Sequence, residues 1–427
     1  MYRFFYSLIF YLLLPVIYFR LWLRGKQNVG YRQRWGERLG FHLPACSNPK
    51  IIWVHSVSVG ETLAAIPLCR CLNQKYPDHQ LLITTTTPTG SERVHAAFGD
   101  SVIHCYLPYD ITPAIRRFLK HFQPALLIIM ETELWPNLIA HCKMSHIPML
   151  LANARLSDKS TKGYLKFAKL TRPMVQALDK IATQSRDDAN NFLKLGANLQ
   201  QISVSGNVKY DLQIEEELLD NSLFLREKIF GQDCKVWIAA STHKGEDEKI
   251  LAIHQRVLEH CPNAKLIIVP RHPERFDRVA ELCLSTYVPF IRRSQLQQAN
   301  AKAGILLGDS MGEMMMYYAM ADCAFVGGSL VETGGHNLLE PAALGLPSIV
   351  GLHTFNFKEA TQTLIEEGAT IQTDEGEMPQ AICYWLTDES ARKTAGQKGK
   401  ELIEKNRGAL HKLMQYIDPL LNRTFVK

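Results

Sequence analysis

The chain has 427 residues, more than a single hydrophobic core normally serves, so we expect two domains of roughly 150 to 200 residues with a cleft between them. Hydrophobic residues make up 46% and charged residues 21% of the chain, which excludes a disordered or low-complexity protein. The 48 lysines and arginines only slightly exceed the 42 acidic residues, so the charge permits acidic ligands without indicating nucleic acid as a partner.

An uncharged apolar segment opens the chain and runs from Phe4 to Phe19. It is slightly shorter than the roughly 17 to 25 apolar residues of a full membrane span, so a spanning helix and an interfacial helix are both compatible with it. No small-residue cleavage site follows the segment. We therefore expect residues 1–26 to remain attached as a membrane-anchor helix.

Positive charge is distributed unequally around this segment. Arg3 precedes it, and a basic cluster follows it: Arg20, Arg24, Lys26, Arg32, Arg34 and Arg38. The positive-inside rule predicts that the body of the protein faces the cytoplasm. The basic cluster also suits anionic lipid headgroups, each charge contributing on the order of 1 kcal/mol near the surface, although a solvated basic loop is the simpler alternative.

From residue 51 onward, short apolar runs alternate with longer amphipathic stretches, which is typical of βαβ units. Strands are expected over residues 51–55, 80–86, 124–130 and 147–152, and helices over residues 62–76 and 90–98. Because the apolar runs are nearly continuous, we expect a parallel sheet that is buried on both faces. Residues 27–210 are predicted to form this first, Rossmann-like α/β domain.

A charged stretch over residues 211–235 interrupts the pattern and is predicted to be a linker or surface helix. New apolar runs follow at residues 236–240, 264–269, 303–307, 323–326 and 348–350. Residues 236–427 are therefore predicted to form a second Rossmann-like domain. The two halves share no repeat of fixed period, so the expected duplication is one of fold type.

Open parallel sheets bind ligands beyond the carboxyl ends of their strands, so the residues just after each strand form the candidate site. Glu61 follows the first strand at a strand-to-helix corner, with the helix expected to begin near Thr62. Backbone N–H groups and the positive end of a helix favour the ionised carboxylate, the state that a general base needs. A helix-capping carboxylate without catalytic function is the alternative.

Two further carboxylates, Glu131 and Glu133, follow a later strand of the same domain. They can bind sugar hydroxyls or support Glu61, and Trp135 can offer a stacking face. Alternatively, this segment caps a helix whose first turn contains Pro136. We favour a functional role for Glu131 and leave the role of Glu133 undecided.

In the second domain, Arg271 lies between Pro270 and His272 in a stiff turn that follows a strand. A guanidinium can pair with a phosphate through two parallel hydrogen bonds. The turn formed by Met311 and Gly312 leads into a helix, whose free N–H groups suit an anion. Together these residues predict a phosphate site.

A glycine-rich segment later in this domain contains Asn337 and Glu340, one helical turn apart on one face. Glycines let a backbone approach a ligand closely, and the Glu340 carboxylate can accept hydrogen bonds from both hydroxyls of a ribose. We therefore favour nucleotide contact for this segment over a helix-start carboxylate beside Pro341.

Metal-binding motifs are absent from the sequence. The ten cysteines are scattered without a Cys-x-x-Cys pair, and there is neither a His-Glu-x-x-His nor an Asp-x-Asp motif. We therefore expect no metal and no cofactor, and we expect the cysteines to stay reduced in the cytoplasm.

Taken together, these blocks resemble the Kdo transferases of lipopolysaccharide synthesis, Kdo being 3-deoxy-D-manno-octulosonic acid. Besides the blocks of the second domain, the resemblance includes residues 31–40, 56–61, 84–90, 130–137, 153–157 and 205–209. It implies an α/β protein of the GT-B fold, with two Rossmann-like domains facing a cleft, and an inverting glycosyltransferase at the cell inner membrane. The implied donor is CMP-Kdo, and the implied acceptor is lipid IVA, a lipid A precursor.

The same resemblance implies roles for individual residues. Glu61 is the expected catalytic base, and Glu131 is expected to help arrange the sugar or the acceptor. CMP is expected to lie against Pro270, Arg271, Met311, Gly312, Asn337 and Glu340.

Two other functions are compatible with parts of this pattern. A GT-B enzyme that transfers a UDP-sugar to a lipid acceptor has the same fold, and fold alone does not exclude it. A membrane-tethered nucleotide-binding protein without turnover is the non-enzymatic alternative, against which an ionisable base at Glu61 argues.

Overall fold

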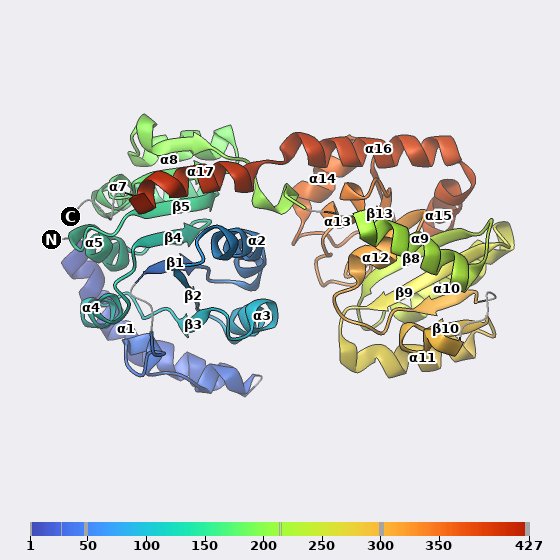
Figure 1. Cartoon of the computed structure of the whole chain (residues 1–427), viewed down its shortest axis with the longest axis horizontal. Helices are drawn as coiled ribbons and strands as arrows, with labels where there is room; N and C mark the ends of the chain where they lie inside the picture. Colours follow the sequence, from blue (N-terminus) through green and yellow to red (C-terminus); the bar gives the residue numbers. More distant parts are fainter. Residues whose placement is uncertain are drawn as a thin grey trace. The chain divides into compact units, whose positions relative to one another are not determined.

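The computed structural model describes residues 2–26, 28–46, 50–212, 214, 216–298 and 303–422. The chain forms two compact units, the first comprising Met1–Asp211 and Arg407–Lys427 and the second Leu212–Asn406. Each unit is built on a sheet that has seven strands among the described residues (Figure 1). All neighbouring strands run parallel, which confirms the prediction of two α/β units with parallel sheets.

The first sheet has the strand order β3-β2-β1-β4-β5-β6-β7. Its strands are β1 Ile51–His55, β2 Gln80–Thr85, β3 Ile103–Tyr106, β4 Leu126–Met130, β5 Met149–Ala154, β6 Lys180–Thr183 and β7 Ile202–Val204. Alternate residues of a strand point to opposite faces, so Ile51 and Trp53 of β1 enter one core and Ile52 and Val54 the other. Both faces of the sheet are therefore buried.

Helices cover both faces of this sheet. Side chains of α4, α5, α7 and α8 fill one core, and side chains of α2, α3 and α17 fill the opposite one. The helices of the first unit are α1 Tyr2–Arg24, α2 Val59–Lys75, α3 Pro88–Phe98, α4 Thr112–Phe122, α5 Pro136–Met144, α6 Asp158–Leu165, α7 Ala168–Gln176, α8 Arg186–Leu195 and α17 Ala409–Asn422.

The second unit repeats this plan, with the strand order β10-β11-β9-β8-β12-β13-β14. Its strands are β8 Lys235–Thr242, β9 Ala264–Pro270, β10 Phe290–Arg292, β11 Ile305–Leu307, β12 Cys323–Val326, β13 Ser348–Val350 and β14 Thr370–Gln372. Its helices are α9 Glu216–Phe230, α10 Asp247–His260, α11 Phe276–Ser285, α12 Met314–Ala319, α13 Leu339–Ala343, α14 Lys358–Glu366, α15 Met378–Thr387 and α16 Glu389–Asn406. Side chains of α10, α11 and α15 pack on one face of the sheet, and those of α9 and α12 pack on the other.

The boundaries of the units differ from the expected ranges at two places. Helix α9 lies within the expected linker 211–235, yet its Ile229 and Phe230 are buried in the core of the second unit. Helix α17 lies within the expected second domain 236–427, yet it belongs to the first unit. In the first unit, the Asp211 carboxylate accepts hydrogen bonds from backbone N–H groups at the start of α17. The apolar face of α17 completes the core on one face of the first sheet.

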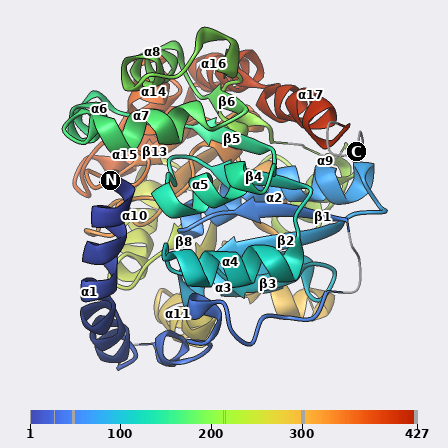
Figure 2. The same cartoon turned by 90° about the vertical axis from the view of Figure 1, so that its left-hand side faces the viewer.

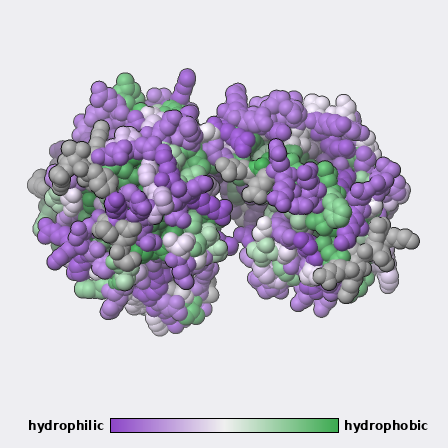
Figure 3. Space-filling model, in the orientation of Figure 1, coloured by the Kyte–Doolittle hydropathy of each residue, from purple (hydrophilic) through white to green (hydrophobic). Residues whose placement is uncertain are grey.

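The N-terminal helix α1 packs lengthwise on the first unit, against α5 and α7 (Figure 2). Within the described residues it is the one helix long and apolar enough to cross a membrane. Its partly or fully buried residues recur with the period of a helix, at Tyr6, Ser7, Phe10, Leu14, Ile17, Tyr18 and Leu21. The opposite face is apolar and exposed, whereas hydrophilic residues dominate the surface of both units in the view of Figure 3.

Candidate active site

The candidate catalytic carboxylates follow two neighbouring strands of the first sheet. From β1 the chain continues outward through β2 and β3 on one side, and it returns to build β4 to β7 on the other. The boundary between β1 and β4 is therefore the topological switch point, where open α/β sheets bind ligands. Glu61 follows β1 and Glu131 follows β4, so the fold brings these two predicted residues to this place.

Glu61 lies in the first turn of α2, which begins at Val59 rather than near the expected Thr62. The helix starts earlier because the Ser58 side chain caps it, accepting a hydrogen bond from the Glu61 N–H at 3.2 Å. In return, the carboxylate of Glu61 accepts hydrogen bonds from the Val57 N–H and the Ser58 hydroxyl, both at 2.7 Å. These contacts fix the carboxylate at the sheet edge, and they resemble a capping box except that the backbone donor is Val57, one residue before the N-cap Ser58.

The ionisation of Glu61 differs from the expectation. Burial raises its pKa to about 7, although the hydrogen bonds from Val57 and Ser58 act in the opposite direction. The charges of Glu133 and Glu131 raise the pKa of Glu61 further. The two hydrogen bonds thus favour the ionised form, but desolvation of a residue that is only 8% exposed outweighs them. A pKa near the working pH suits a general base, because the group can both accept and release a proton.

The loop after β4 holds the other two carboxylates. Glu131 has a φ of 54°, a left-handed conformation that is strained for a residue other than glycine, and its N–H donates to the Ala152 carbonyl at 2.9 Å. Glu133 accepts a hydrogen bond from the Trp135 indole N–H at 2.9 Å, and burial raises the pKa of Glu133. The Trp135 ring packs against the core, which leaves only part of it as a stacking face. Pro136 begins α5, so this segment also starts a helix.

In the second unit, β8 and β12 flank the corresponding switch point, and β9 lies next to β8. Pro270 ends β9, and the backbone N–H of Arg271 donates to the Thr242 carbonyl at the end of β8. Burial lowers the pKa of His243, an effect to which the charge of Arg271 adds, and the same charge opposes the rise that burial causes in the pKa of Glu340. The backbone hydrogen bond places Arg271 beside the start of the loop after β8.

Two histidines that the sequence did not single out meet beside Arg271. The Nε2 atoms of His243 and His336 are 2.7 Å apart, and their rings stack with centroids separated by 5.0 Å. Burial lowers the pKa of His336 to about 4, with contributions from His243, Arg271 and His272, and burial also lowers the pKa of His243. Both imidazoles are therefore neutral at pH 7, and one ring must donate the hydrogen bond to the other.

Asn337 and Glu340 are brought together as predicted. The Asn337 side-chain amide donates to the Glu340 carboxylate at 3.1 Å. Burial raises the pKa of Glu340, an effect that the hydrogen bond from Asn337 and the charge of Arg271 oppose. Glu340 lies in the first turn of α13 beside Pro341, which is the place of a helix-start carboxylate. Its pairing with Asn337 is the arrangement expected for contact with a ribose, so the structure is compatible with both interpretations.

Met311 and Gly312 follow β11, the strand next to β9. Met311 is 56% exposed, and Gly312 has a φ of 84° with open space where a side chain would project. The following helix, α12, has six residues, and the Glu313 carboxylate lies just before its start, paired with Arg293 at 2.6 Å. Among the described contacts, none joins Met311 or Gly312 to Arg271.

Glu246 links the loops that follow β8 and β12. It is fully buried, and its carboxylate accepts hydrogen bonds from the backbone N–H groups of His243, Gly328, Ser329 and Leu330 at 2.7 to 3.1 Å. It thereby ties the loop after β8 to the glycine-rich loop after β12. Glu246 and the glycine-rich loop are more than 80 residues apart in the sequence, so the sequence did not reveal this role.

Two more features of the described residues bear on chemistry. None of them forms a group of three or more His, Cys, Asp or Glu side chains that could hold a metal ion. All ten cysteines are free thiols.

Comparisons with solved structures identify the class of fold. A glycosyltransferase from Rickettsia africae aligns with 88% of this chain and 99% of its own, at a TM-score of 0.52 and 14% identity. A putative UDP-N-acetylglucosamine 2-epimerase from Listeria monocytogenes aligns with 88% of this chain and 98% of its own, at a TM-score of 0.53 and 13% identity. With its two doubly wound units, the chain has a fold of the GT-B type.

Sequence comparisons identify the family. The family model described as 3-deoxy-D-manno-octulosonic-acid transferase matches residues 33–212. The 3-deoxy-D-manno-octulosonic acid transferase of Haemophilus influenzae is 44% identical over 99% of this chain and 100% of its own, and that of Bordetella pertussis is 35% identical over 90% of this chain and 91% of its own. The chain belongs to the Kdo transferase family.

Proposed function

We propose that this protein transfers Kdo from CMP-Kdo to lipid IVA. The observation that carries the proposal is Glu61, a buried carboxylate with a pKa near 7 at the switch point of the first sheet. The second unit supplies Arg271 for the phosphate of CMP and Glu340 for its ribose, with Pro270, Met311, Gly312 and Asn337 as further contacts. The family membership of the chain and the names of its relatives support the choice of sugar.

In the proposed reaction, Glu61 accepts the proton of an acceptor hydroxyl. The hydroxyl oxygen forms a bond to the anomeric carbon of Kdo, while the bond from this carbon to the phosphate oxygen breaks and its electron pair leaves with CMP. Attack from the face opposite CMP inverts the configuration at the anomeric carbon. Arg271 stabilises the charge that develops on the phosphate, and Glu131 helps to orient the sugar or the acceptor.

A donor assay tests the proposed reaction. We expect the purified protein with lipid IVA to release CMP from CMP-Kdo and to incorporate Kdo into the lipid in equal amounts. UDP-sugars should give no UDP release above the rate without enzyme. Transfer from a UDP-sugar would assign the protein to another GT-B activity, and nucleotide binding without turnover of any donor would contradict an enzymatic function.

The contacts of α1 favour a helix that lies in the membrane interface. A helix of 23 residues is about 35 Å long, enough to span the hydrocarbon core. Yet Ser7 bonds to Asn137 at 2.9 Å, and Tyr18 packs on Trp35 and Tyr109 at ring distances of 5.0 and 5.8 Å. A spanning helix would lose these contacts or draw the polar body of the unit into the bilayer.

The exposed face of α1 can instead enter the lipid surface. It presents large apolar side chains along its whole length: Phe4, Phe5, Leu8, Ile9, Leu12, Leu13, Val16, Phe19, Trp22 and Leu23. Such a helix binds with its apolar face buried about 5 to 10 Å deep at the boundary of the headgroups. The exposed members of the basic cluster, Arg20, Arg24, Lys26 and Arg32, then lie among anionic headgroups on the cytoplasmic side. Arg38, which was predicted to belong to this cluster, is instead buried, and Arg34 pairs with Glu37 at 2.7 Å within the first unit.

Tags at the two ends of the chain test this topology. With protease added outside intact spheroplasts, we expect both an N-terminal and a C-terminal tag to be protected, because an interfacial helix keeps both ends in the cytoplasm. Digestion of the N-terminal tag alone would show that α1 spans the membrane. Digestion of the body would show the opposite orientation. Lysed spheroplasts, in which both tags must be cut, are the control.

A further inference from the structure

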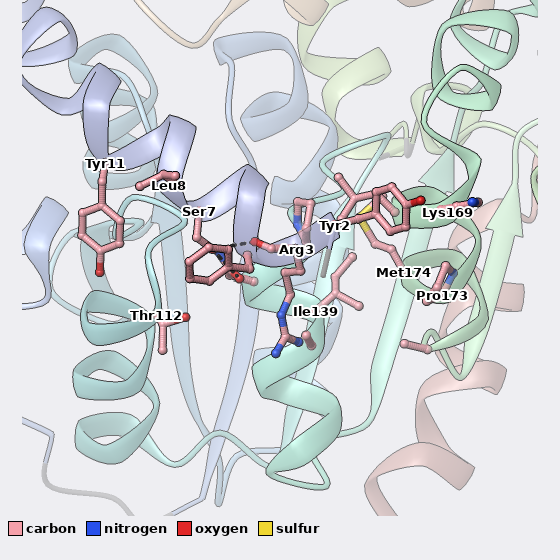
Figure 4. Close-up of a pocket in the computed structure, with 16 residues that line it drawn as sticks. Tyr2, Arg3, Ser7, Leu8, Tyr11, Thr112, Ile139, Lys169, Pro173 and Met174 are labelled. Atoms are coloured by element: carbon pink, nitrogen blue, oxygen red, sulfur yellow. Dashed lines mark hydrogen bonds between the residues drawn. The ribbon is translucent and has the colours of Figure 1, made fainter.

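A pocket of about 660 Å³ lies in the first unit beside the N-terminal half of α1 (Figure 4). Its walls come from α1, α5 and α7, and they are mainly apolar, with Leu8, Ile139 and Met174 among them. The bond between Ser7 and Asn137 joins α1 to α5 at the pocket and holds the two helices in place. None of these side chains was predicted as a catalytic or CMP-binding residue.

Two cations give the pocket a positive charge. Arg3 and Lys169 both line it, and none of its sixteen described lining residues is acidic. The Lys169 ammonium lies 5.3 Å from the centre of the Tyr2 ring on α1. This cation–π contact holds the Lys169 side chain against the α1 wall of the pocket. A ligand that combines a phosphate with acyl chains matches both properties, because the cations pair with the phosphate and the apolar walls accept the chains.

The pocket also adjoins the catalytic edge of the sheet. Pro136 and Asn137 line it, and they directly follow the loop that holds Glu131 and Glu133. Five residues span at most about 18 Å from Glu131 to Pro136, which is within the length of one lipid molecule. A lipid anchored in the pocket can therefore extend its sugar to the carboxylates.

We propose that this pocket binds the phosphorylated, acylated part of the acceptor lipid and thereby directs its sugar hydroxyl toward the edge with Glu61. This inference rests on the proposed function and names the site by which its acceptor is held. The α1 helix would then serve two purposes, since its outer face contacts the membrane while its N-terminal half forms a wall of the acceptor pocket.

Acceptor kinetics provide the first test. With CMP-Kdo saturating, we expect the double variant Arg3→Ala/Lys169→Ala to raise the KM for lipid IVA about tenfold, since two phosphate contacts are lost. Ala140→Phe, which fills the pocket and keeps both cations, should raise the KM similarly. The affinity for CMP should not change in either variant, which shows that the second unit is intact. Lys162→Ala, which removes an exposed charge of α6 outside the pocket, is the matched control.

An unchanged KM in both pocket variants would overturn the inference, while normal wild-type turnover in the same assay would leave the proposed function standing. Photocrosslinking identifies the occupant directly. A photoreactive amino acid at Ala140 should crosslink to lipid IVA, and excess lipid IVA should compete whereas phosphatidylglycerol should not. Competition by phosphatidylglycerol alone would make the pocket a site for bilayer phospholipid and would contradict an acceptor site.

Discussion

Arg271→Ala and Glu340→Ala should each weaken the binding of CMP by roughly 10- to 150-fold. The first substitution removes the guanidinium expected to pair with the phosphate, and the second removes the carboxylate expected to accept the ribose hydroxyls. Losing a hydrogen bond to a charged group costs about 1.5 to 3 kcal/mol, and each 1.4 kcal/mol changes the dissociation constant tenfold. Isothermal titration calorimetry with CMP measures this effect directly.

A matched control is available in the same unit. Arg278 lies on α11 with 65% of its side chain exposed, and it pairs with Glu281 across the helix surface at 3.4 Å. Arg278→Ala removes the same charge and should leave the affinity for CMP nearly unchanged. If Arg271→Ala and Glu340→Ala also bind CMP with wild-type affinity, the donor site must be elsewhere in the protein.

The fold was predictable to the extent that its strands are long and apolar. The runs of β1, β4 and β9 are continuous and bounded by turn residues, so the sequence indicated both sheets. The strands that the sequence did not indicate are short or partly exposed: β3, β6, β7, β10 and β14. Four of them, β3, β7, β10 and β14, are edge strands, and β6 lies inside its sheet but has only four residues. Runs of three or four residues bury too little apolar surface to produce a clear pattern.

The domain boundary depended on contacts that no local pattern reveals. The charged stretch before residue 235 resembles a linker because the apolar residues of α9 are interspersed with charges, and some, such as Phe224, are exposed. Its Ile229 and Phe230 nevertheless complete the second core. The return of α17 to the first unit depends on its partners in α2 and β5, which lie more than 250 residues earlier in the chain. Long-range packing of this kind is decided by the tertiary structure.

The candidate site was predictable where residues follow strands, and less so where loops meet. Glu61, Glu131 and Arg271 were selected by their places at the ends of strands, and they follow β1, β4 and β9 in the structure. Glu340 was selected by its glycine-rich segment and its spacing from Asn337, and it lies in the first turn of α13. The pairing of His243 with His336 joins loops that are 93 residues apart. The strand order was the missing information, because β8 and β12 become neighbours only once the sheet is assembled.

The raised pKa of Glu61 also depends on the folded structure. In the sequence, a carboxylate at a helix start indicates an ionised group, whereas burial and two neighbouring carboxylates reverse the direction of the shift. Because Glu61 must be deprotonated to accept a proton, kcat/KM should rise about tenfold per pH unit below about 7 and level off above it. A profile that is flat between pH 5 and 8 would contradict this assignment.

Glu61→Gln should leave the protein folded and able to bind CMP, while it slows Kdo transfer by a factor on the order of 100 or more. The amide oxygen can still accept the hydrogen bond from the Val57 N–H, and the amide NH2 can donate to the Ser58 hydroxyl oxygen, so the start of α2 is retained. The amide cannot take up a proton at neutral pH. Glu92→Gln, an exposed carboxylate on α3 of the same unit, is the matched control and should transfer at the wild-type rate.

The most direct measurement is single-turnover Kdo transfer by Glu61→Gln, with CMP affinity and melting temperature determined on the same preparation. The proposed mechanism predicts wild-type CMP affinity, a nearly unchanged melting temperature and a rate at least about 100-fold lower. Near-wild-type transfer with a lowered melting temperature would show that Glu61 only caps α2, and it would remove this residue from the mechanism.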